Sequence, residues 1–207
     1  MQGRQKLIIG TRNKNKFNEI KSILLQSPEI HKVNIVSLND LYNIPEIIED
    51  GKTIQENAIK KALFLCKKTN CIVLSDDTGI EVEYLNGAPG VYSARFAGEK
   101  CSYSDNNKKL LELLKNVSFE KRKARFVCAI VLAKSEQDFF LVEESVEGYI
   151  TEEERGKNGF GYDPVFLLPE YNKTFAEMPS ELKNKISHRA KAVNKIKSVL
   201  LEILNKI

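Results

Sequence analysis

Short apolar runs and segments of helical periodicity alternate along the first third of the chain. Residues 7–11 and 33–38 are apolar runs that end in polar turns, which is typical of buried strands. Residues 14–25 and 53–68 place apolar side chains three and four positions apart, as one face of a helix requires. Residues 71–74 form another apolar run. The pattern therefore predicts strands that alternate with helices.

The rest of the chain has longer apolar segments. Residues 80–85 alternate apolar and acidic side chains, which predicts a half-buried strand, and the Asn86-Gly87 pair that follows is typical of a turn. A helix is expected to begin with Ser104 or Asp105 as its N-cap. The remaining predicted elements are a hairpin of two long strands, a short strand and a terminal helix, at residues 124–134, 139–150, 165–168 and 180–207.

Because strands and helices alternate early and a hairpin comes late, the sequence predicts an α/β fold with a mixed sheet. No Pro/Gly-rich linker, low-complexity stretch or internal repeat marks a boundary, so residues 1–207 are expected to form a single domain. The composition agrees with a globular protein, since 42% of the residues are apolar and 29% are charged.

The sequence contains no sign of a membrane or secreted protein. No apolar run approaches the roughly 18–20 residues that span a bilayer. Residues 1–6 are polar and lack the hydrophobic region and cleavage site of a signal peptide. A cytoplasmic location without a membrane partner is therefore expected. The four cysteines form no C-x-x-C pair and are predicted to be free thiols: Cys66, Cys71, Cys101 and Cys128.

The net charge of +4 is mild, and part of the positive charge gathers in the last third of the chain. Such a basic region can bind nucleic acid, bind a polyanionic small molecule or form a solvated helix face. The charge pattern leaves these three alternatives open. The basic residues concerned are Lys183, Lys185, Arg189, Lys191, Lys195 and Lys197.

The segment Thr11–Lys16 lies where a predicted strand gives way to a helix. Free backbone N–H groups at a helix N-terminus favour phosphate. Asn13 can cap the helix, and Lys14 and Lys16 add positive charge. The phosphate-loop pattern G-x-x-x-x-G-K-[ST] is absent. These residues are consistent with a phosphate-binding helix start and also with an ordinary capped helix.

Two adjacent carboxylates, Asp76 and Asp77, follow the apolar run 71–74. Ligands bind at strand ends in open α/β sheets, and Mg²⁺ is held by one or two carboxylates together with phosphate oxygens and water. The pair is therefore a candidate metal site at the end of a strand. The alternative is an Asx-type turn in which Gly79 supplies an unusual backbone angle.

Two later segments carry further candidate residues. In residues 159–164 two glycines allow close approach of the backbone, and Phe160 can stack on a base, although a Gly-rich turn explains the same residues. Lys183, His188 and Arg189 present hydrogen-bond donors suited to phosphate or to a base carbonyl. Since His31 is the only other histidine, a multi-histidine metal site is excluded. Together the segments suit a site for a base, a triphosphate and a metal.

Ordered motifs along nearly the whole chain match one known family. They are Thr11, Asn13, Lys16 and Glu19 in the pattern T-x-N-x-x-K-x-x-E, then Glu56-Asn57-Ala58, Ser75–Gly79, Gly87–Arg95, Phe160–Pro164, Lys173-Thr174 and Lys183–Arg189. On these motifs the chain resembles the inosine triphosphate pyrophosphatase family, also called the Ham1 family. The number and order of the motifs make the resemblance specific.

The resemblance implies hydrolysis of ITP, dITP and XTP to the monophosphate and pyrophosphate with Mg²⁺ as cofactor. It implies a homodimer of an elongated α/β fold, a mixed sheet flanked by helices, with two lobes and a central active-site cleft. Asp77 is implied to be the proton acceptor and a metal ligand, and Glu49 the second ligand, with Glu46 as its rival. The residues implied to bind substrate are Thr11, Arg12, Asn13, Lys14, Asn15, Lys16, Thr78, Phe160, Gly161, Tyr162, Asp163, Lys183, His188 and Arg189.

The chain departs from the family pattern in three places, one of which is the loosely aligned acidic segment 45–51 that contains Glu46 and Glu49. Arg12 stands where glycine is common, and Thr78 stands where serine is more usual. A different class of function, a nucleotide-binding or nucleic-acid-binding module without turnover, is the main alternative. The acid pair argues against it, because carboxylates at the centre of a polyanion site require a metal. We therefore expect a purine nucleoside triphosphate, and no nucleic acid, as the partner, with Asp76 supporting Asp77.

Overall fold

The computed structural model describes residues 5–205 of the chain. Most of the polar N-terminal segment discussed above and the last two residues of the predicted terminal helix lie outside this range. The helices are α1 (Lys14–Leu24), α2 (Ile54–Thr69), α3 (Tyr103–Leu113), α4 (Ser180–Ile186) and α5 (His188–Asn205). The strands are β1 (Lys6–Ile9), β2 (Asn34–Ser37), β3 (Ile72–Val82), β4 (Lys123–Ala133), β5 (Phe139–Ile150), β6 (Phe166–Leu168) and β7 (Lys173–Thr174).

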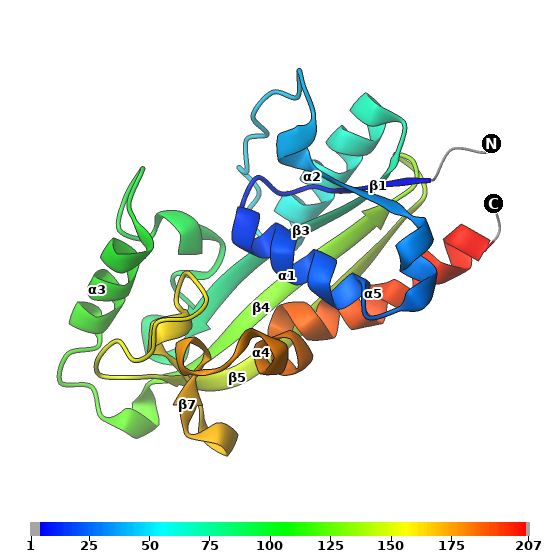
Figure 1. The fold of residues 1–207 in the computed structure, drawn as a ribbon. Coiled ribbons are helices and arrows are strands. Elements are labelled where there is room, and N and C mark those ends of the chain that lie inside the picture. Colours follow the sequence, from blue (N-terminus) through cyan, green and yellow to red (C-terminus); the bar gives the residue numbers. More distant parts are fainter. Residues whose placement is uncertain (1–4, 206–207) are drawn as a thin grey trace. The chain divides into compact units, whose positions relative to one another are not determined.

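Within the described residues, seven strands form one mixed sheet in the order β2-β1-β3-β4-β5-β6-β7. β1 pairs in parallel with both β2 and β3, which requires crossover connections such as those containing α1 and α2. β6 pairs antiparallel with β5 and with β7. The predicted α/β class with a mixed sheet is therefore confirmed (Figure 1).

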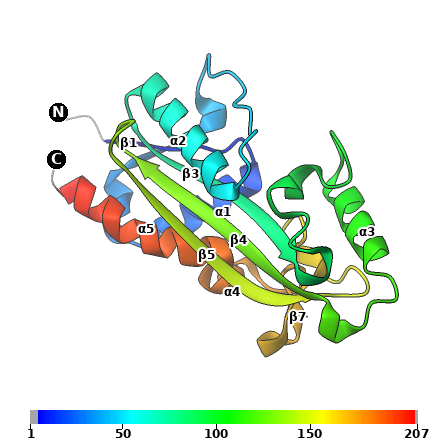
Figure 2. The same cartoon turned by 180° about the vertical axis from the view of Figure 1, so that it is seen from behind.

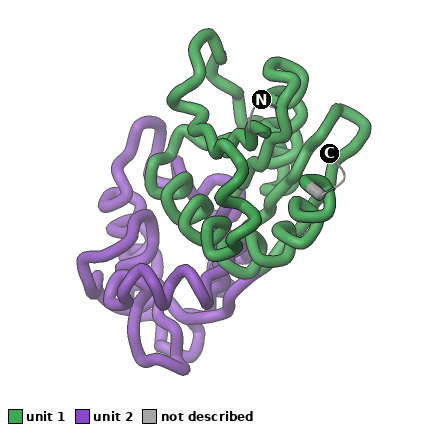
Figure 3. Tube along the Cα trace, turned by 45° about the vertical axis from the view of Figure 1, so that its right-hand side comes forward, with its two compact units in different colours: residues 1–77, 128–144, 189–207 green, residues 78–127, 145–188 purple. Residues whose placement is uncertain are grey.

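The chain groups into two compact units (Figure 3). Unit 1 contains residues 1–77, 128–144 and 189–207, and unit 2 contains residues 78–127 and 145–188. The strands β3, β4 and β5 each carry residues of both units. The prediction that residues 1–207 form a single domain stays a prediction.

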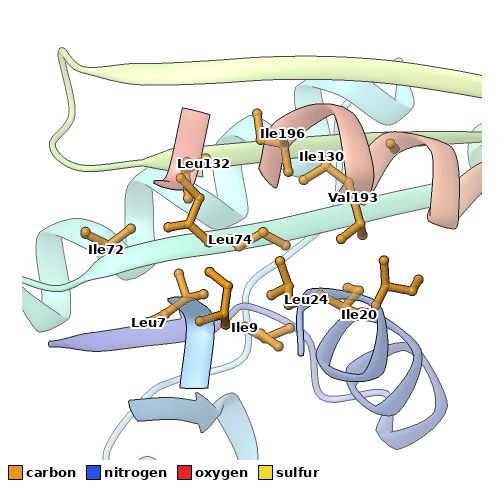
Figure 4. Packing of buried hydrophobic residues seen from close by; sticks show 14 of the residues in the cluster. Leu7, Ile9, Ile20, Leu24, Ile72, Leu74, Ile130, Leu132, Val193 and Ile196 are labelled. Atoms are coloured by element: carbon orange, nitrogen blue, oxygen red, sulfur yellow. The ribbon is translucent and has the colours of Figure 1, made fainter. Parts of the chain in front are cut away.

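Unit 1 buries apolar side chains on both faces of its strands. Leu7 and Ile9 of β1 belong to one core cluster, together with residues of β3, β4, α1 and α5, whereas Ile8 between them points to the other face. Figure 4 shows Ile20 and Leu24 of α1 directed toward these strands. Helix α2 lies on the opposite face from α1 and α5 (Figures 1 and 2). The strands of unit 1 are thus covered by helices on both sides.

The core of unit 2 combines aliphatic side chains with a group of packed aromatic rings. The ring of Phe126, on β4, meets the ring of Phe166, on β6, edge to face with centroids 4.7 Å apart. Phe166 stacks in turn on Phe175 at 5.3 Å. Leu110 and Leu114, within and just after α3, belong to the same cluster, and so does Tyr162 from the Gly-rich loop. The predicted base-binding segment is therefore attached directly to the core of its unit.

The prediction that the acid pair lies at the end of a strand is wrong. Ser75–Gly79 lies inside β3, which runs unbroken from Ile72 to Val82. Asp76 and Asp77 are nearly inaccessible to solvent. β3 is therefore buried at two charged residues, where local polarity favours a turn. The physical reason is that cations from other elements neutralise the carboxylates, which removes the need to expose them.

Other boundaries also differ from the predictions. Helix α3 has Ser102 as its N-cap, and Asp105 is the third helical residue, which closes a capping box with Ser102. The predicted terminal helix is interrupted at Ser187, whose extended backbone separates α4 from α5. The predicted free thiols are confirmed for all four cysteines. Among the described residues no helix is both long and apolar enough to cross a membrane.

Candidate functional site

The start of α1 is built as the sequence predicts. Asn13 is the N-cap, and its side-chain oxygen accepts hydrogen bonds from the backbone N–H groups of Asn15 (2.9 Å) and Lys16 (3.3 Å). Before this turn, a Cβ atom at Gly10 would lie 2.1 Å from Ser75 Oγ. Glycine is therefore required for β1 to deliver the helix start this close to β3.

Lys16 of α1 reaches the first acid of the pair. Its ammonium lies 3.0 Å from Asp76 Oδ2, and the guanidinium of Arg189 lies 3.6 Å from the same oxygen. Arg189 also forms an ion pair with Glu19, so both cations of this group are tied to α1. Burial alone would raise the pKa of Asp76, but the charges of Lys16 and Arg189 outweigh burial and hold that pKa well below its usual range.

The second acid meets different partners. Asp77 Oδ2 accepts a hydrogen bond from the side-chain amide of Asn57 (3.1 Å), and Asp77 Oδ1 lies 3.9 Å from the ammonium of Lys61. Burial raises the pKa of Asp77 above its ordinary value, with further contributions from the carboxylates of Glu49 and Asp76. Lys61 opposes that rise. The carboxyl of Asp77 thus binds a proton more readily than that of Asp76.

The two acids differ because consecutive side chains of a strand point to opposite faces of the sheet. Asp76 faces α1 and α5, which supply Lys16 and Arg189, whereas Asp77 faces α2, which supplies Asn57 and Lys61. Adjacency in sequence therefore does not force the carboxylates to share one environment. We call Lys16, Glu49, Lys61, Asp76 and Asp77 the unit 1 acid–base cluster.

The carboxylates of Glu49 and Asp77 converge on one cation. Lys61 Nζ lies 3.0 Å from Glu49 Oε1 and 3.9 Å from Asp77 Oδ1. Within residues 5–205, no group of three or more His, Cys, Asp or Glu side chains is placed to hold a metal ion. Two carboxylates fit Mg²⁺, which keeps several waters and takes its remaining ligands from phosphate oxygens. The pair Asp77 and Glu49 is thus chemically suited to Mg²⁺ bound together with a phosphorylated substrate.

In unit 2, Phe160, Asp163 and Lys183 form a second group, which we call the unit 2 aromatic–lysine cluster. Lys183 of α4 forms a buried ion pair with Asp163, and its ammonium lies 4.8 Å from the centroid of the Phe160 ring. Asp163 Oδ2 also accepts a hydrogen bond from the backbone N–H of Phe160 (2.8 Å). A buried cation and an aromatic ring are therefore held together by one carboxylate.

The other residues of the Gly-rich loop anchor it. The hydroxyl of Tyr162 donates to the backbone carbonyl of Ser93 (2.8 Å), and burial raises the pKa of Tyr162. Asn107 of α3 donates from its side-chain amide to the carbonyl of Gly161 (3.1 Å). Gly159 and Gly161 both have φ in the left-handed region, at 70° and 64°. The loop therefore depends on its glycines and on α3 for its conformation.

Several predicted substrate ligands lie outside these two clusters. The guanidinium of Arg12 donates to the backbone carbonyl of Ile44 (2.7 Å), so it is engaged with the loop that follows β2. Lys14 and Asn15 are exposed, and Thr78 is half-buried on β3 beside Asp77. His188 is buried in unit 2, where its ring stacks on Phe126 with centroids 4.5 Å apart. Direct contact of these residues with a nucleotide stays a prediction.

Three residues in these groups were not among the predicted site residues: Asn57, Lys61 and Asn107. Asn57 and Lys61 are four positions apart on α2, which places them on the same helix face, and both are less than 10% exposed. The available signal was that both positions fall at helical spacing with the apolar side chains of the predicted helix 53–68, which places them on its inward face. Asn107 carried no comparable signal, because its partner is a backbone carbonyl 54 positions away.

Known proteins resemble this chain over almost all of its length. A sequence model described as Ham1 family matches residues 7–199. A dITP/XTP pyrophosphatase of Thermoanaerobacter pseudethanolicus is 51% identical, covering 97% of this chain and 99% of the relative. A dITP/XTP pyrophosphatase of Bacillus licheniformis is 50% identical, covering 95% and 98%.

Solved structures agree with these relatives. A HAM1 protein from Coxiella burnetii has a TM-score of 0.85 and 36% identity, covering 96% of this chain and 99% of that chain. The Ham1 protein of Staphylococcus aureus has a TM-score of 0.83 and 37% identity, with the same coverage. At these identities and scores the likeness extends to sequence and fold together.

Lys16 and Lys14, two residues apart on α1, provide a matched test of the buried ion pair. Replacing Lys16 by Met leaves Asp76 buried with only part of its positive surroundings, so we expect the free energy of unfolding to fall by roughly 3 kcal/mol. Lys14→Met changes an exposed side chain and should stay within about 0.5 kcal/mol of wild type. Urea unfolding measures both, and equal effects of the two substitutions would contradict the assigned role of Lys16.

Proposed function

This chain belongs to the Ham1 family, and we propose that it hydrolyses purine nucleoside triphosphates with a 6-oxo base, such as dITP, ITP and XTP, to the monophosphate and pyrophosphate. The observation that carries the proposal is the unit 1 acid–base cluster, in which two buried acids lie between lysines beside a helix start. The names of the relatives, dITP/XTP pyrophosphatases, support the substrate class. Such an enzyme removes deaminated purines from the nucleotide pool.

Mg²⁺ is the proposed cofactor, with Asp77 and Glu49 as its protein ligands. Their convergence on Lys61 supports this choice, because a site that accommodates an ammonium between two carboxylates favours a cation. When bound, Mg²⁺ offsets negative charge on the phosphate oxygens. Glu49 is preferred to Glu46 because Glu49 contacts Lys61 and raises the pKa of Asp77.

The chain's own residues have separate tasks in the proposed reaction. Asp77 accepts a proton from the attacking water or orients that water, and its raised pKa supports this use. Lys16 and the positive end of the α1 helix dipole bind phosphate and stabilise pyrophosphate as it leaves. Asp76 keeps Lys16 charged and in place, since it is the nearest anion and raises the pKa of that lysine despite burial.

The unit 2 aromatic–lysine cluster is the proposed base site. Phe160 offers a ring face, and Lys183 offers a cationic donor to the 6-oxo group of hypoxanthine or xanthine. Adenine carries an amino group at that position, so in a complex with ATP an N–H of Lys183 would face another donor in place of an acceptor. Asp163 supports this arrangement by keeping Lys183 beside the ring.

The alternative of a nucleic-acid-binding module has less support. Of the basic residues in the last third, Lys183 and Arg189 are each less than 5% exposed and engaged in ion pairs. Lys185, Lys191 and Lys195 are exposed, as on a solvated helix face. The absence of a nucleic-acid partner, the homodimer and the cytoplasmic location stay predictions.

A product assay tests the central proposal. With dITP or ITP we expect pyrophosphate as the product, and Asp77→Asn should lower kcat/KM about a thousandfold because it removes the proton acceptor. Asp138→Asn, at a half-buried acid in the hairpin turn of β4 and β5, is the control and should leave the rate unchanged. Release of orthophosphate instead would refute cleavage of the α–β bond, and full activity of Asp77→Asn would refute its role.

The identity of the second metal ligand can be tested with two glutamates of the same segment. Glu49→Gln should raise the Mg²⁺ concentration that gives half-maximal rate by about tenfold or more, because it removes a ligand charge. Glu46→Gln should leave that concentration unchanged. The reverse result in Mg²⁺ titrations at saturating substrate would assign the ligand to Glu46.

Base selectivity can be tested on α4. Lys183→Met should narrow the ratio of kcat/KM for ITP to that for ATP at least tenfold, since the donor to the 6-oxo group is lost. Lys185→Met, on the exposed side of the same helix, should leave the ratio as in wild type. Melting temperatures of both variants reveal any loss of fold, and an unchanged ratio for Lys183→Met would remove Lys183 from base recognition.

A further inference from the structure

Asn57 joins two parts of the unit 1 site with a single side chain. It lies in the first half of α2 and is 1% exposed. Its Nδ2 donates to Asp77 Oδ2 (3.1 Å), and its Oδ1 accepts from the backbone N–H of Gly51 (2.8 Å). The segment that contains Gly51 also contains Glu49. One buried amide therefore connects the carboxylate of Asp77 to the chain beside Glu49.

The chemistry of the partners allows only one orientation of this amide. An ionised carboxylate only accepts hydrogen bonds, so the NH₂ group must face Asp77. A backbone N–H only donates, so the carbonyl oxygen must face Gly51. With Oδ2 engaged by Asn57, the other oxygen, Oδ1, is the one on the side of Lys61. Asn57 thereby distinguishes the two oxygens of Asp77.

The space around Gly51 shows separately that this segment packs closely against α2. A Cβ atom at this position would lie 2.6 Å from Asn57 Oδ1 and 2.9 Å from Glu56 Cβ. Any larger residue would push the segment away from α2. Neighbouring contacts hold it as well, because Glu56 accepts from Lys52 N–H (2.6 Å) and Lys60 pairs with Asp50 (2.5 Å). The segment is therefore seated on the first turns of α2.

We propose that Asn57 is a positioning residue for the metal site, which orients Asp77 and holds the Glu49 segment at one distance from it. The inference rests on the proposed function, since it concerns the same two carboxylates. A residue that hydrogen-bonds a metal ligand without touching the metal typically changes metal affinity 10–100-fold when it is replaced. A residue that only stabilises the fold changes the melting temperature and leaves metal affinity intact.

The test uses two variants that disturb the contact from opposite sides. Asn57→Leu removes both hydrogen bonds at similar volume, and Gly51→Ala displaces the segment while it keeps the amide. Mn²⁺ binding in the absence of nucleotide is measured by electron paramagnetic resonance. We expect each variant to weaken this binding by about 10–100-fold. The Mg²⁺ concentration for half-maximal pyrophosphate release should rise in parallel. If Asn57→Leu does not fold, Gly51→Ala decides alone.

Asn106 in unit 2 provides the matched control. It is also a buried helical asparagine, which accepts from Ala97 N–H (2.7 Å) and donates to the carbonyl of Ala94 (3.2 Å). Asn106→Leu should lower the melting temperature as Asn57→Leu does and leave Mn²⁺ binding unchanged.

Unchanged Mn²⁺ binding in the folded variants at positions 57 and 51 would overturn the inference. Wild-type protein that binds Mn²⁺ but hydrolyses no nucleoside triphosphate would overturn only the proposed function, and the Mn²⁺ comparison would still decide the role of Asn57. Wild-type protein that binds no Mn²⁺ either without or with a nucleoside triphosphate would overturn both.

Discussion

The burial of Asp76 is the constraint on which the arrangement of unit 1 depends. A carboxylate without solvent in the middle of a strand would be strongly destabilising unless cations lay beside it. Lys16 and Arg189 supply those cations from two helices that are far apart in the sequence. Because Arg189 also pairs with Glu19, the same charge network fixes α1 and the start of α5 against β3. Neutralising one acid thus fixes the position of α1 beside β3.

The alternation of side chains along β3 then separates the two acids. Asp76 is held ionised by cations on one face, and Asp77 on the other face has a raised pKa beside Asn57 and Lys61. In the proposed reaction, these opposite pKa shifts suit Asp76 to the role of a fixed anion and Asp77 to that of a proton acceptor. The same division explains why α2 matters: its buried Asn57 and Lys61 contact Asp77 on that face and also contact Gly51 and Glu49 of the preceding segment.

In unit 2, as in unit 1, one buried carboxylate positions several other groups. Asp163 receives both the ammonium of Lys183 and the backbone N–H of Phe160, so one carboxylate sets the position of a cation and of an aromatic ring. The left-handed glycines on either side of Phe160 make this possible, and a Cβ atom at Gly159 would lie 2.0 Å from Asp163 Oδ2. In each unit a buried acid thus organises the groups around it.

The sequence by itself determined the α/β class, most of the strands and helices, the capping role of Asn13 and the family, because apolar periodicity, cap residues and ordered motifs are local properties. It placed Asp76 and Asp77 at a strand end, since local polarity predicts a turn. Only the tertiary structure decided that β3 continues through them, because the neutralising Lys16, Lys61 and Arg189 come from distant segments. The two hydrogen bonds that link Asn57 to Gly51 and to Asp77 could not be predicted from the sequence either, because hydrogen bonds between elements depend on how those elements pack.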